Sequence, residues 1–127
     1  MTTLLGLLAL AYAAWGVGGQ DTTITVGIPS NPRYQAQAAH MPHAYQLGQP
    51  CEITIRPEWV EWPQDYTLYV LTHEAGHCLG LDHSEDTGSI MYRNTDYRGT
   101  ITLADWEALR NARPPMRYRA IAIGVAQ

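Results

Sequence analysis

The sequence predicts an α+β domain in which a small mixed sheet lies over a central helix and a second helix closes the fold. Three observations predict it. Segments 22–28 and 51–56 are rich in β-branched residues and run into a proline, as strands do. Segments 65–79 and 103–112 carry the apolar spacing of helices. The 127 residues leave room for one such domain.

The regions between these segments give weaker signals. In segment 29–48, Asn31-Pro32 could open a short helix through Ala39, but the alternating Ala and Gln residues could also be extended. Segment 84–100 is rich in turn residues. Segment 117–125 alternates weakly and predicts either a final strand or a loose tail.

A helix over 65–79 would have two distinct faces. At 100° per residue, one side collects the apolar side chains of Leu68, Leu71, Ala75, Cys78 and Leu79. His73 and His77 lie almost opposite, where an ordinary amphipathic helix carries small polar or charged residues. Asp65 is a favourable N-cap at its start. This helix is expected to pack on a core and to form the floor of a cleft.

The closing helix, 103–112, has a start signal and a stop signal. Thr102 followed by Asp105 resembles a capping box in which Asp replaces Glu. Arg113 and the two prolines after it end the helix.

The first nineteen residues, 1–19, contain no charged side chain, and 4–14 is a continuous apolar run. With the small-residue pattern Ala11-Tyr12-Ala13, this favours a secretory signal peptide. An uncleaved membrane anchor is a second interpretation, because the run is just short of a full span. A buried helix of the core is a third. The preferred interpretation predicts a domain of residues 20–127 that is secreted or extracytoplasmic, and the second predicts one anchored to a membrane.

Cys51 and Cys78 are the only cysteines in the chain. Cys51 begins a predicted strand and Cys78 lies on the apolar side of the predicted helix, so a disulfide could tie sheet to helix if the chain is exported. Two separate buried thiols are the alternative, because free cysteines are commonly buried. The sequence leaves both interpretations open.

A segment that reads HEAGHCLGLDHS carries the candidate metal ligands. His73 and His77 stand four residues apart and project from one face of a helix. Gly80 can adopt the left-handed conformation that ends a helix and turns the chain back, which lets His83 supply a third nitrogen. Three imidazoles leave the fourth position of a tetrahedral zinc to water, as catalytic sites require. The pattern predicts one catalytic Zn²⁺, with Glu74 beside the first ligand as general base.

Together with the turn Ser89-Ile90-Met91-Tyr92, this pattern resembles the matrixins, the matrix-metalloproteinase branch of the metzincin zinc endopeptidases. In that family a serine follows the third histidine, as Ser84 does here, and the downstream turn looks like its Met-turn. Trp106 and Leu109 fall where its closing helix carries apolar residues. The resemblance covers roughly 40–110, more than half of the chain.

The resemblance implies a zincin-like fold and zinc-dependent hydrolysis of peptide bonds in extended polypeptides. Glu74 would accept a proton from the attacking water and pass it to the leaving amine. Met91 is expected to support the histidines as a hydrophobic base and not as a ligand, because a thioether is a poor partner for zinc beside three imidazoles. The implied substrate edge lies near 38–45. Tyr69, Tyr92 and His43 are the expected substrate-pocket residues, and the bulk of Tyr69 favours medium-sized apolar side chains.

Three departures from the family pattern limit what the resemblance implies. Ile53 stands where a ligand of the family's second, structural zinc would be, so no structural zinc is predicted. Arg93 replaces the proline that follows the Met-turn. Only about 45 residues separate 1–19 from Asp65, too few for an inhibitory prodomain and a complete five-stranded upper subdomain. The sequence predicts a minimal form of the family.

The expected partner is a peptide or protein substrate. A net charge of −4 argues against a nucleic-acid footprint, and membrane contact is expected only if 1–19 remains attached. Two other functions stay open: a zinc-containing binding or structural module without turnover, and a maturation protease for one partner. Intact Glu74 favours the enzyme over the module.

Overall fold

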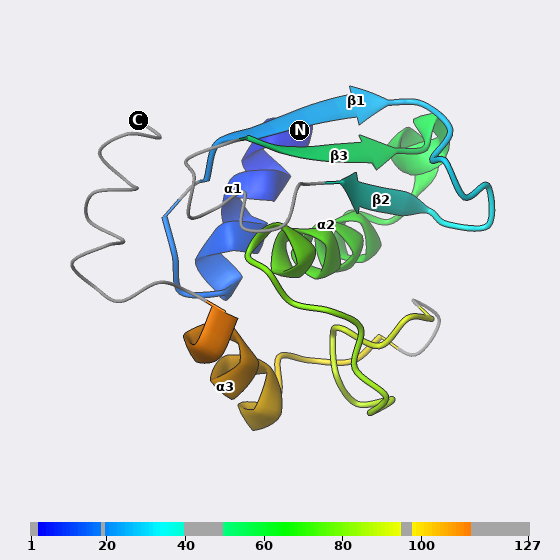
Figure 1. Ribbon diagram of the computed structural model, residues 1–127. Helices are drawn as coiled ribbons and strands as arrows, with labels where there is room; N and C mark the ends of the chain where they lie inside the picture. The colour runs from blue at the N-terminus through cyan, green and yellow to red at the C-terminus, as the bar shows by residue number, and fades with distance from the viewer. Residues whose placement is uncertain (1–2, 19, 40–49, 95–97, 113–127) are drawn as a thin grey trace.

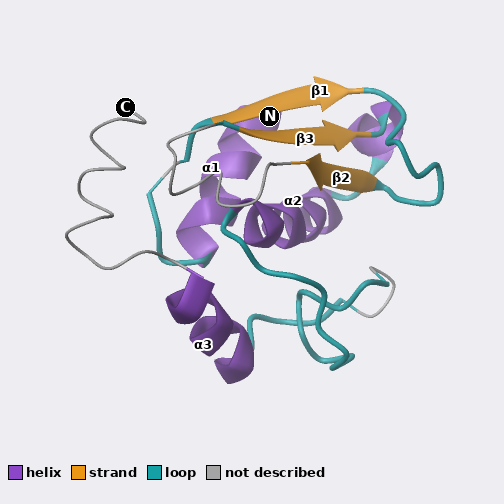
Figure 2. Cartoon of the chain, viewed as in Figure 1, coloured by secondary structure: helices purple, strands orange, loops and turns teal. Residues whose placement is uncertain are grey.

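The computed structural model describes residues 3–18, 20–39, 50–94 and 98–112. Its elements, shown in Figures 1 and 2, are in chain order α1 (Leu4–Ala14), β1 (Thr22–Val26), β2 (Ala36–Ala39), β3 (Cys51–Ile55), the 3-10 helix η1 (Pro57–Glu61), α2 (Gln64–Cys78) and α3 (Leu103–Ala112). The sheet lies on one side of α2, and α3 lies on the other side, below α2 in Figure 1.

The sheet is mixed because its central strand, β3, has a parallel neighbour and an antiparallel one. β1 pairs with β3 in parallel, starting with Thr22 opposite Cys51, and β2 pairs antiparallel on the other side. Along β3, Cys51, Ile53 and Ile55 are buried while Glu52 is exposed, the alternation of a strand with one covered face. The predicted α+β fold with a small mixed sheet is confirmed.

The strand predictions are close to the observed elements. β1 and β3 end at Val26 and Ile55, slightly before the predicted ends. Within the ambiguous segment 29–48, β2 shows that the extended interpretation is right for the residues the structure describes. His43 and the strand or tail predicted for 117–125 lie outside the described residues.

Helix α1 packs against α2 and belongs to the core. One of its faces is buried, comprising Leu7, Leu8, Ala11 and Tyr12. Trp15, directly after the helix, is 1% exposed and donates its indole N–H to the carbonyl of Thr72 on α2 at 2.8 Å. In the structure α1 is therefore part of the core, and the signal-peptide and anchor interpretations of 1–19 stay predictions. None of the described helices combines the length and apolar character needed to cross a bilayer.

Helix α2 differs from its prediction in two ways. It begins at Gln64 with Pro63 as N-cap, so Asp65 lies in the first turn and the N-cap prediction was wrong. The fixed φ of proline suits this position, and the Asp65 carboxylate still favours the positive end of the helix dipole. The helix is also buried on more than one side, and His73 is only 3% exposed, because α1, the sheet and the turn around Met91 surround it.

A disulfide joins the sheet to α2, and a capping box fixes the start of α3. Cys51 at the start of β3 forms a disulfide with Cys78 at the end of α2, with a Cα–Cα distance of 5.6 Å, so of the two open interpretations the structure has the bridge. The predicted capping box of α3 is confirmed. The Asp105 N–H donates to Thr102 Oγ1 at 3.2 Å, and the Thr102 N–H donates to Asp105 Oδ2 at 2.9 Å.

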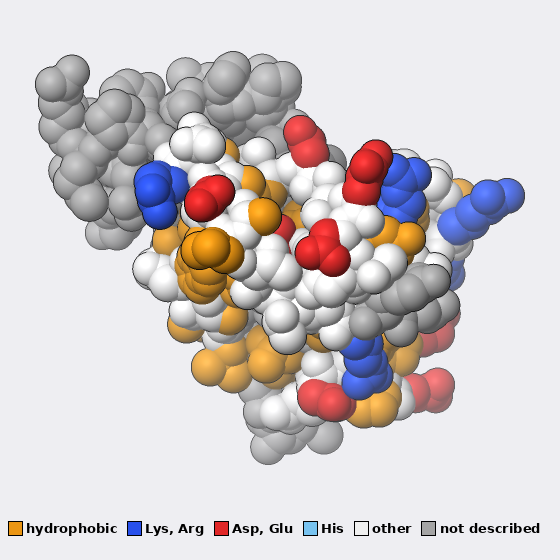
Figure 3. All heavy atoms as spheres, turned by 90° about the horizontal axis from the view of Figure 1, so that it is seen from below, with side chains coloured by type: hydrophobic (Ala, Val, Ile, Leu, Met, Phe, Trp, Pro, Cys, Tyr) orange, Lys and Arg blue, Asp and Glu red, His pale blue; other side chains and the backbone are white. Residues whose placement is uncertain are grey.

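The surface seen from below in Figure 3 mixes charge signs. Arginine and acidic side chains are scattered among polar and hydrophobic ones on this face, and no broad basic area covers it. This mixture of signs agrees with the small net charge of −4 of the sequence.

Candidate metal centre and cleft

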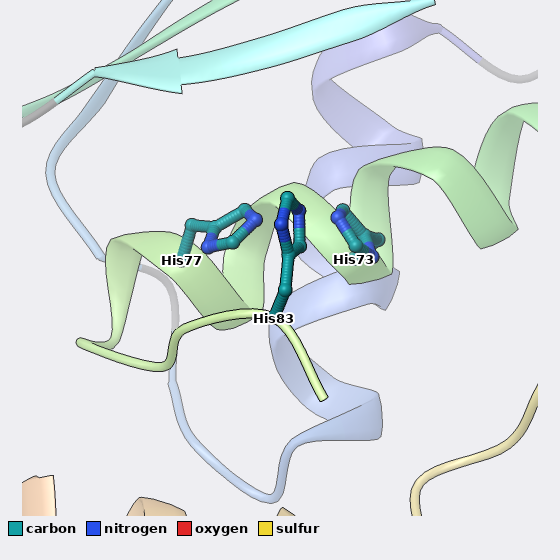
Figure 4. Close-up of side chains that lie close together, drawn as sticks. All are labelled: His73, His77 and His83. Atoms are coloured by element: carbon teal, nitrogen blue, oxygen red, sulfur yellow. The ribbon is translucent and has the colours of Figure 1, made fainter. Parts of the chain in front are cut away.

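Three histidine side chains meet above the C-terminal half of α2. His73 and His77 project from the helix, and His83 reaches between them from the loop that follows (Figure 4). Their ring centroids are 4.8 to 5.3 Å apart, and one nitrogen of each lies within 4.8 Å of the others. In the part of the chain that the structure describes, this is the group of side chains that could hold a metal ion.

The chain reversal that brings His83 back depends on Gly80. Its φ is +103°, in the region that favours glycine, as its predicted helix-ending role requires. The Gly80 N–H donates to the carbonyl of His77 at 2.9 Å, and the Leu81 N–H donates to that of Gly76 at 3.0 Å. This pair of bonds is a Schellman motif, which ends α2 and turns the chain toward the helix.

Backbone carbonyls orient two of the rings. His73 Nδ1 lies 2.6 Å from the carbonyl oxygen of Ile90, and His77 Nδ1 lies 2.7 Å from that of Leu81. A carbonyl only accepts, so each Nδ1 carries the proton and each Nε2 keeps a lone pair. Carbonyl-anchored imidazoles of this kind are typical metal ligands, and these two together with His83 fit zinc.

Burial favours the neutral, metal-binding form of the histidines. It lowers the pKa of His73 to about 4, and the neighbouring His77 acts in the same direction. Burial also lowers the pKa of His83, with the charge of Arg93 as the second cause. Because imidazole must be deprotonated to bind a metal, these histidines are ready to do so at neutral pH.

Glu74 lies between the metal centre and the sheet. It is 5% exposed, and its Oε1 accepts a hydrogen bond of 2.8 Å from the backbone N–H of Ala38 on β2. Burial raises the pKa of Glu74 to about 8, and the Ala38 hydrogen bond opposes that rise. The carboxylate is therefore both beside the first histidine and anchored to the edge strand, a link that sequence reasoning missed.

Met91 lies beneath α2 and is fully buried. A Cβ added to Gly76 would come within 2.5 Å of its sulfur and 2.8 Å of Trp15 Cζ2, so the helix has a glycine where Met91 and Trp15 press against it. The Met91 carbonyl accepts from the Ser84 N–H at 2.9 Å, which ties the turn to the residue after His83. Met91 thus has the position of the predicted hydrophobic support.

A buried polar network fixes the same turn. The Ser89 hydroxyl lies 2.8 Å from both carboxylate oxygens of Asp105, and it accepts the N–H of Met91 at 2.9 Å. Asp105 is only 4% exposed, and the sequence indicated it as a helix cap alone. One carboxylate therefore serves both the start of α3 and the turn next to the metal centre.

A cavity of about 790 Å³ opens over the three histidines and Glu74. Its walls come from 33–38, from α2, from 80–83, and from Arg93 and Asn94. Of the predicted pocket residues, Tyr69 and Tyr92 are not among the described residues that line it, and Tyr69 instead stacks on Tyr66 with a centroid distance of 6.4 Å.

The matrixin family model matches residues 15–110, three quarters of the chain, and includes all three histidines and Glu74. This chain belongs to the matrixin family. The family resemblance and the metzincin-type α+β fold expected from the sequence are therefore both confirmed.

Curated relatives match over shorter stretches. Interstitial collagenase from Sus scrofa is 35% identical over 79 residues, which are 58% of this chain and 17% of that protein. Interstitial collagenase from Aquarana catesbeiana is 37% identical over 76 residues, 56% of this chain and 20% of that protein. Neutrophil collagenase from Homo sapiens is 40% identical over 63 residues, 46% and 14% of the two chains. The matrixin chain spans a fifth or less of the length of these relatives. No solved structure gives a significant match.

Proposed function

We propose that this matrixin is a zinc-dependent endopeptidase that hydrolyses peptide bonds of extended polypeptides. The observation that carries the proposal is the convergence of His73, His77 and His83 beside the Glu74 carboxylate, inside a cavity bordered by an edge strand. These three nitrogens would hold one catalytic zinc. The similarity to collagenases supports peptide hydrolysis without identifying a substrate.

Each side chain of the site has a defined task in this proposal. A bound zinc supplies Lewis acidity and lowers the pKa of water toward about 7. Glu74 accepts the proton of the attacking water and delivers it to the leaving amine. Because the Ala38 N–H holds Oε1, the second oxygen is left for that proton. The carbonyls of Ile90 and Leu81 keep the His73 and His77 rings in place during the reaction.

The substrate is proposed to bind along β2. Among the described strands, β2 is an edge strand that pairs with β3 alone, and Ala36, Gln37 and Ala38 line the cavity. A strand edge of this kind can pair with an extended peptide through main-chain hydrogen bonds. Such a mode places the scissile bond near Ala38, where Glu74 is anchored.

We propose that the protein works outside the cytoplasm. The Cys51–Cys78 disulfide supports this location, because such bonds form and persist in oxidising compartments. This placement does not require 1–19 to be removed.

Replacing Glu74 by Gln tests the proposed mechanism. The Glu74→Gln variant should bind zinc as the wild type does, while its cleavage rate falls by about 10²- to 10⁴-fold, the usual contribution of a general base. Zinc content is measured by elemental analysis, and cleavage is measured on an unstructured protein with and without chelator. Glu61→Gln, an exposed glutamate on η1, is the matched control and should cleave normally.

The same assays separate the alternative functions. A zinc-loaded wild type that cleaves nothing would support the binding or structural module. Cleavage confined to one partner protein would support the maturation protease. Wild-type turnover by Glu74→Gln would remove Glu74 from its proposed role.

A further inference from the structure

Two arginines line the cavity from different walls, and nothing in the proposed reaction uses them. Arg33 belongs to the turn before β2, and Arg93 follows the Met91 turn next to the third histidine. Both side chains are exposed. Within the described residues, the ion pair that forms is Arg98 with Asp65, so neither cavity arginine has a carboxylate partner there.

The turn that presents Arg33 is held by a set of hydrogen bonds. The Arg33 N–H donates to Asn31 Oδ1 at 3.0 Å, and the Tyr34 N–H donates to the Asn31 carbonyl at 3.0 Å. The Arg56 guanidinium donates to the carbonyls of Tyr34, at 2.8 Å, and Pro32. The backbone around Arg33 is therefore already ordered. A ligand that binds Arg33 would have to order only the arginine side chain.

The backbone before Arg93 is also fixed. Ser84 is bridged to Tyr92, and the Ser84 N–H donates to the Met91 carbonyl. Arg93 lines the same cavity as His83 and the other two histidines. Its side chain therefore belongs to the wall around the metal centre.

The acidic groups of the cavity do not cancel these two charges. Glu74 is buried and accepts the N–H of Ala38, which leaves Asp82 as the exposed carboxylate among the described lining residues. A substrate on β2 would thus meet two solvated guanidiniums, groups that bind carboxylates with charge-assisted and often bidentate hydrogen bonds.

We infer that Arg33 and Arg93 make the cleft select peptides that carry Asp or Glu near the scissile bond. The inference rests on the endopeptidase function proposed above and adds a substrate class to it. Solvent-exposed ion pairs are modest in strength, so each arginine should contribute a preference of about two- to fivefold for Glu over Gln.

Paired peptides that differ only in Glu or Gln test the inference. In one series of fluorogenic peptides, a single Glu is moved through the positions around the scissile bond, and each peptide has a Gln twin. For the zinc-loaded full chain, Glu should raise kcat/KM at one position or more by about fivefold, and the gain should shrink in about 0.5 M NaCl. Arg33→Gln and Arg93→Gln should each remove the gain in kcat/KM at the substrate position that the replaced arginine contacts.

Arg110→Gln is the matched control, because Arg110 is an exposed arginine of α3 outside the cavity lining. It should keep the full preference for Glu. A second readout avoids turnover: zinc-loaded Glu74→Gln protein should bind the preferred Glu peptide more tightly than its Gln twin in fluorescence anisotropy. Equal binding or cleavage of the twins, or an equal loss in Arg110→Gln, overturns the inference. Absence of cleavage with retained preference in binding instead overturns the endopeptidase proposal alone.

Discussion

Burial raises the pKa of Glu74 and lowers the pKa of His73 and His83. The folded state keeps a proton on Glu74 that the unfolded chain releases, because the pKa of Glu74 rises from 4.5 to about 8. The folded state excludes a proton from His73 that the unfolded chain takes up, because its pKa falls from 6.5 to about 4. Both groups therefore link the stability of the metal-free protein to pH.

The metal-free protein should lose stability as pH rises from 6.5 to 8. At pH 6.5 about half of the unfolded chains still carry the His73 proton, so the opposing effect of His73 fades as pH rises through the window. Glu74 binds more protons in the folded than in the unfolded state throughout it. The free energy of unfolding should fall by up to about 1.4 kcal/mol per pH unit. Below pH 6.5, His73 opposes this fall. Urea unfolding with chelator at several pH values measures the slope.

Glu74→Gln supplies the comparison, because the amide does not titrate. Its unfolding free energy should be flatter than that of the wild type between pH 6.5 and 8. An identical slope in both proteins would show that another group causes the pH dependence.

At this scale the sequence predicts local chemistry well and distant contacts poorly. His73, Glu74 and His77 follow from helix periodicity, and the φ of Gly80 explains how His83 joins them. The bond from the Ala38 N–H to Glu74 joins residues 36 apart, and no local pattern encodes it.

Helix α2 packs closely on Met91 and Trp15 because it has a glycine, Gly76, at the point of contact. Gly76 lies mid-helix, where alanine would normally be preferred by about 1 kcal/mol. Here a methyl group would meet the sulfur of Met91 at 2.5 Å and Trp15 at 2.8 Å. The cost of overpacking, about 1–3 kcal/mol, therefore exceeds the gain in helix propensity.

Gly76→Ala should lower the thermal midpoint of unfolding and weaken zinc binding, since Met91 must move beneath the histidines. Differential scanning calorimetry and zinc titration measure the two effects. Gly27→Ala is the control, because a Cβ there meets nothing within 4 Å. A neutral result for Gly76→Ala would mean that the turn around Met91 yields without cost.

Whether a segment is a helix or a strand was easier to predict than which of its faces are buried. The bounds of α3 match the prediction, since both its capping box and its proline stop are local signals. The predicted apolar face of α2 is in the core, and its histidine face lines the cavity. The prediction was incomplete because periodicity reports one apolar stripe, whereas α1 and Met91 cover further sides of this helix. The N-cap of α2 is Pro63, two residues before the predicted Asp65, because proline can itself begin a helix.

On the scale of the whole molecule, α1 is the element whose role the sequence left open between a leader, an anchor and a core helix. An uncharged apolar run is typical of a secretory signal, yet tertiary packing places half of α1 in the core. The contacts that hold α1 there, such as the hydrogen bond from Trp15 Nε1 to the Thr72 carbonyl, join residues 57 apart. Hydropathy cannot separate a leader from a buried helix of the same length.

Two leucines of α1 separate these interpretations. Leu7 is 2% exposed and Leu5 is 67% exposed. If α1 is a core helix, Leu7→Ala should destabilise the protein by about 2–5 kcal/mol, and Leu5→Ala should change stability by no more than about 0.5 kcal/mol. Chemical denaturation measures both. Equal, negligible effects, together with an intact mass that lacks 1–19, would restore the leader interpretation.

The disulfide between Cys51 and Cys78 couples redox conditions to the shape of the cleft. It joins β3, the central strand of the sheet, to the end of α2, the helix that carries His73 and His77. A covalent bond therefore holds the sheet against the floor of the cleft. In a reducing cytosol, Cys51 and Cys78 would stay as free thiols. The reduced protein would lack this covalent link between β3 and the helix that carries His73 and His77.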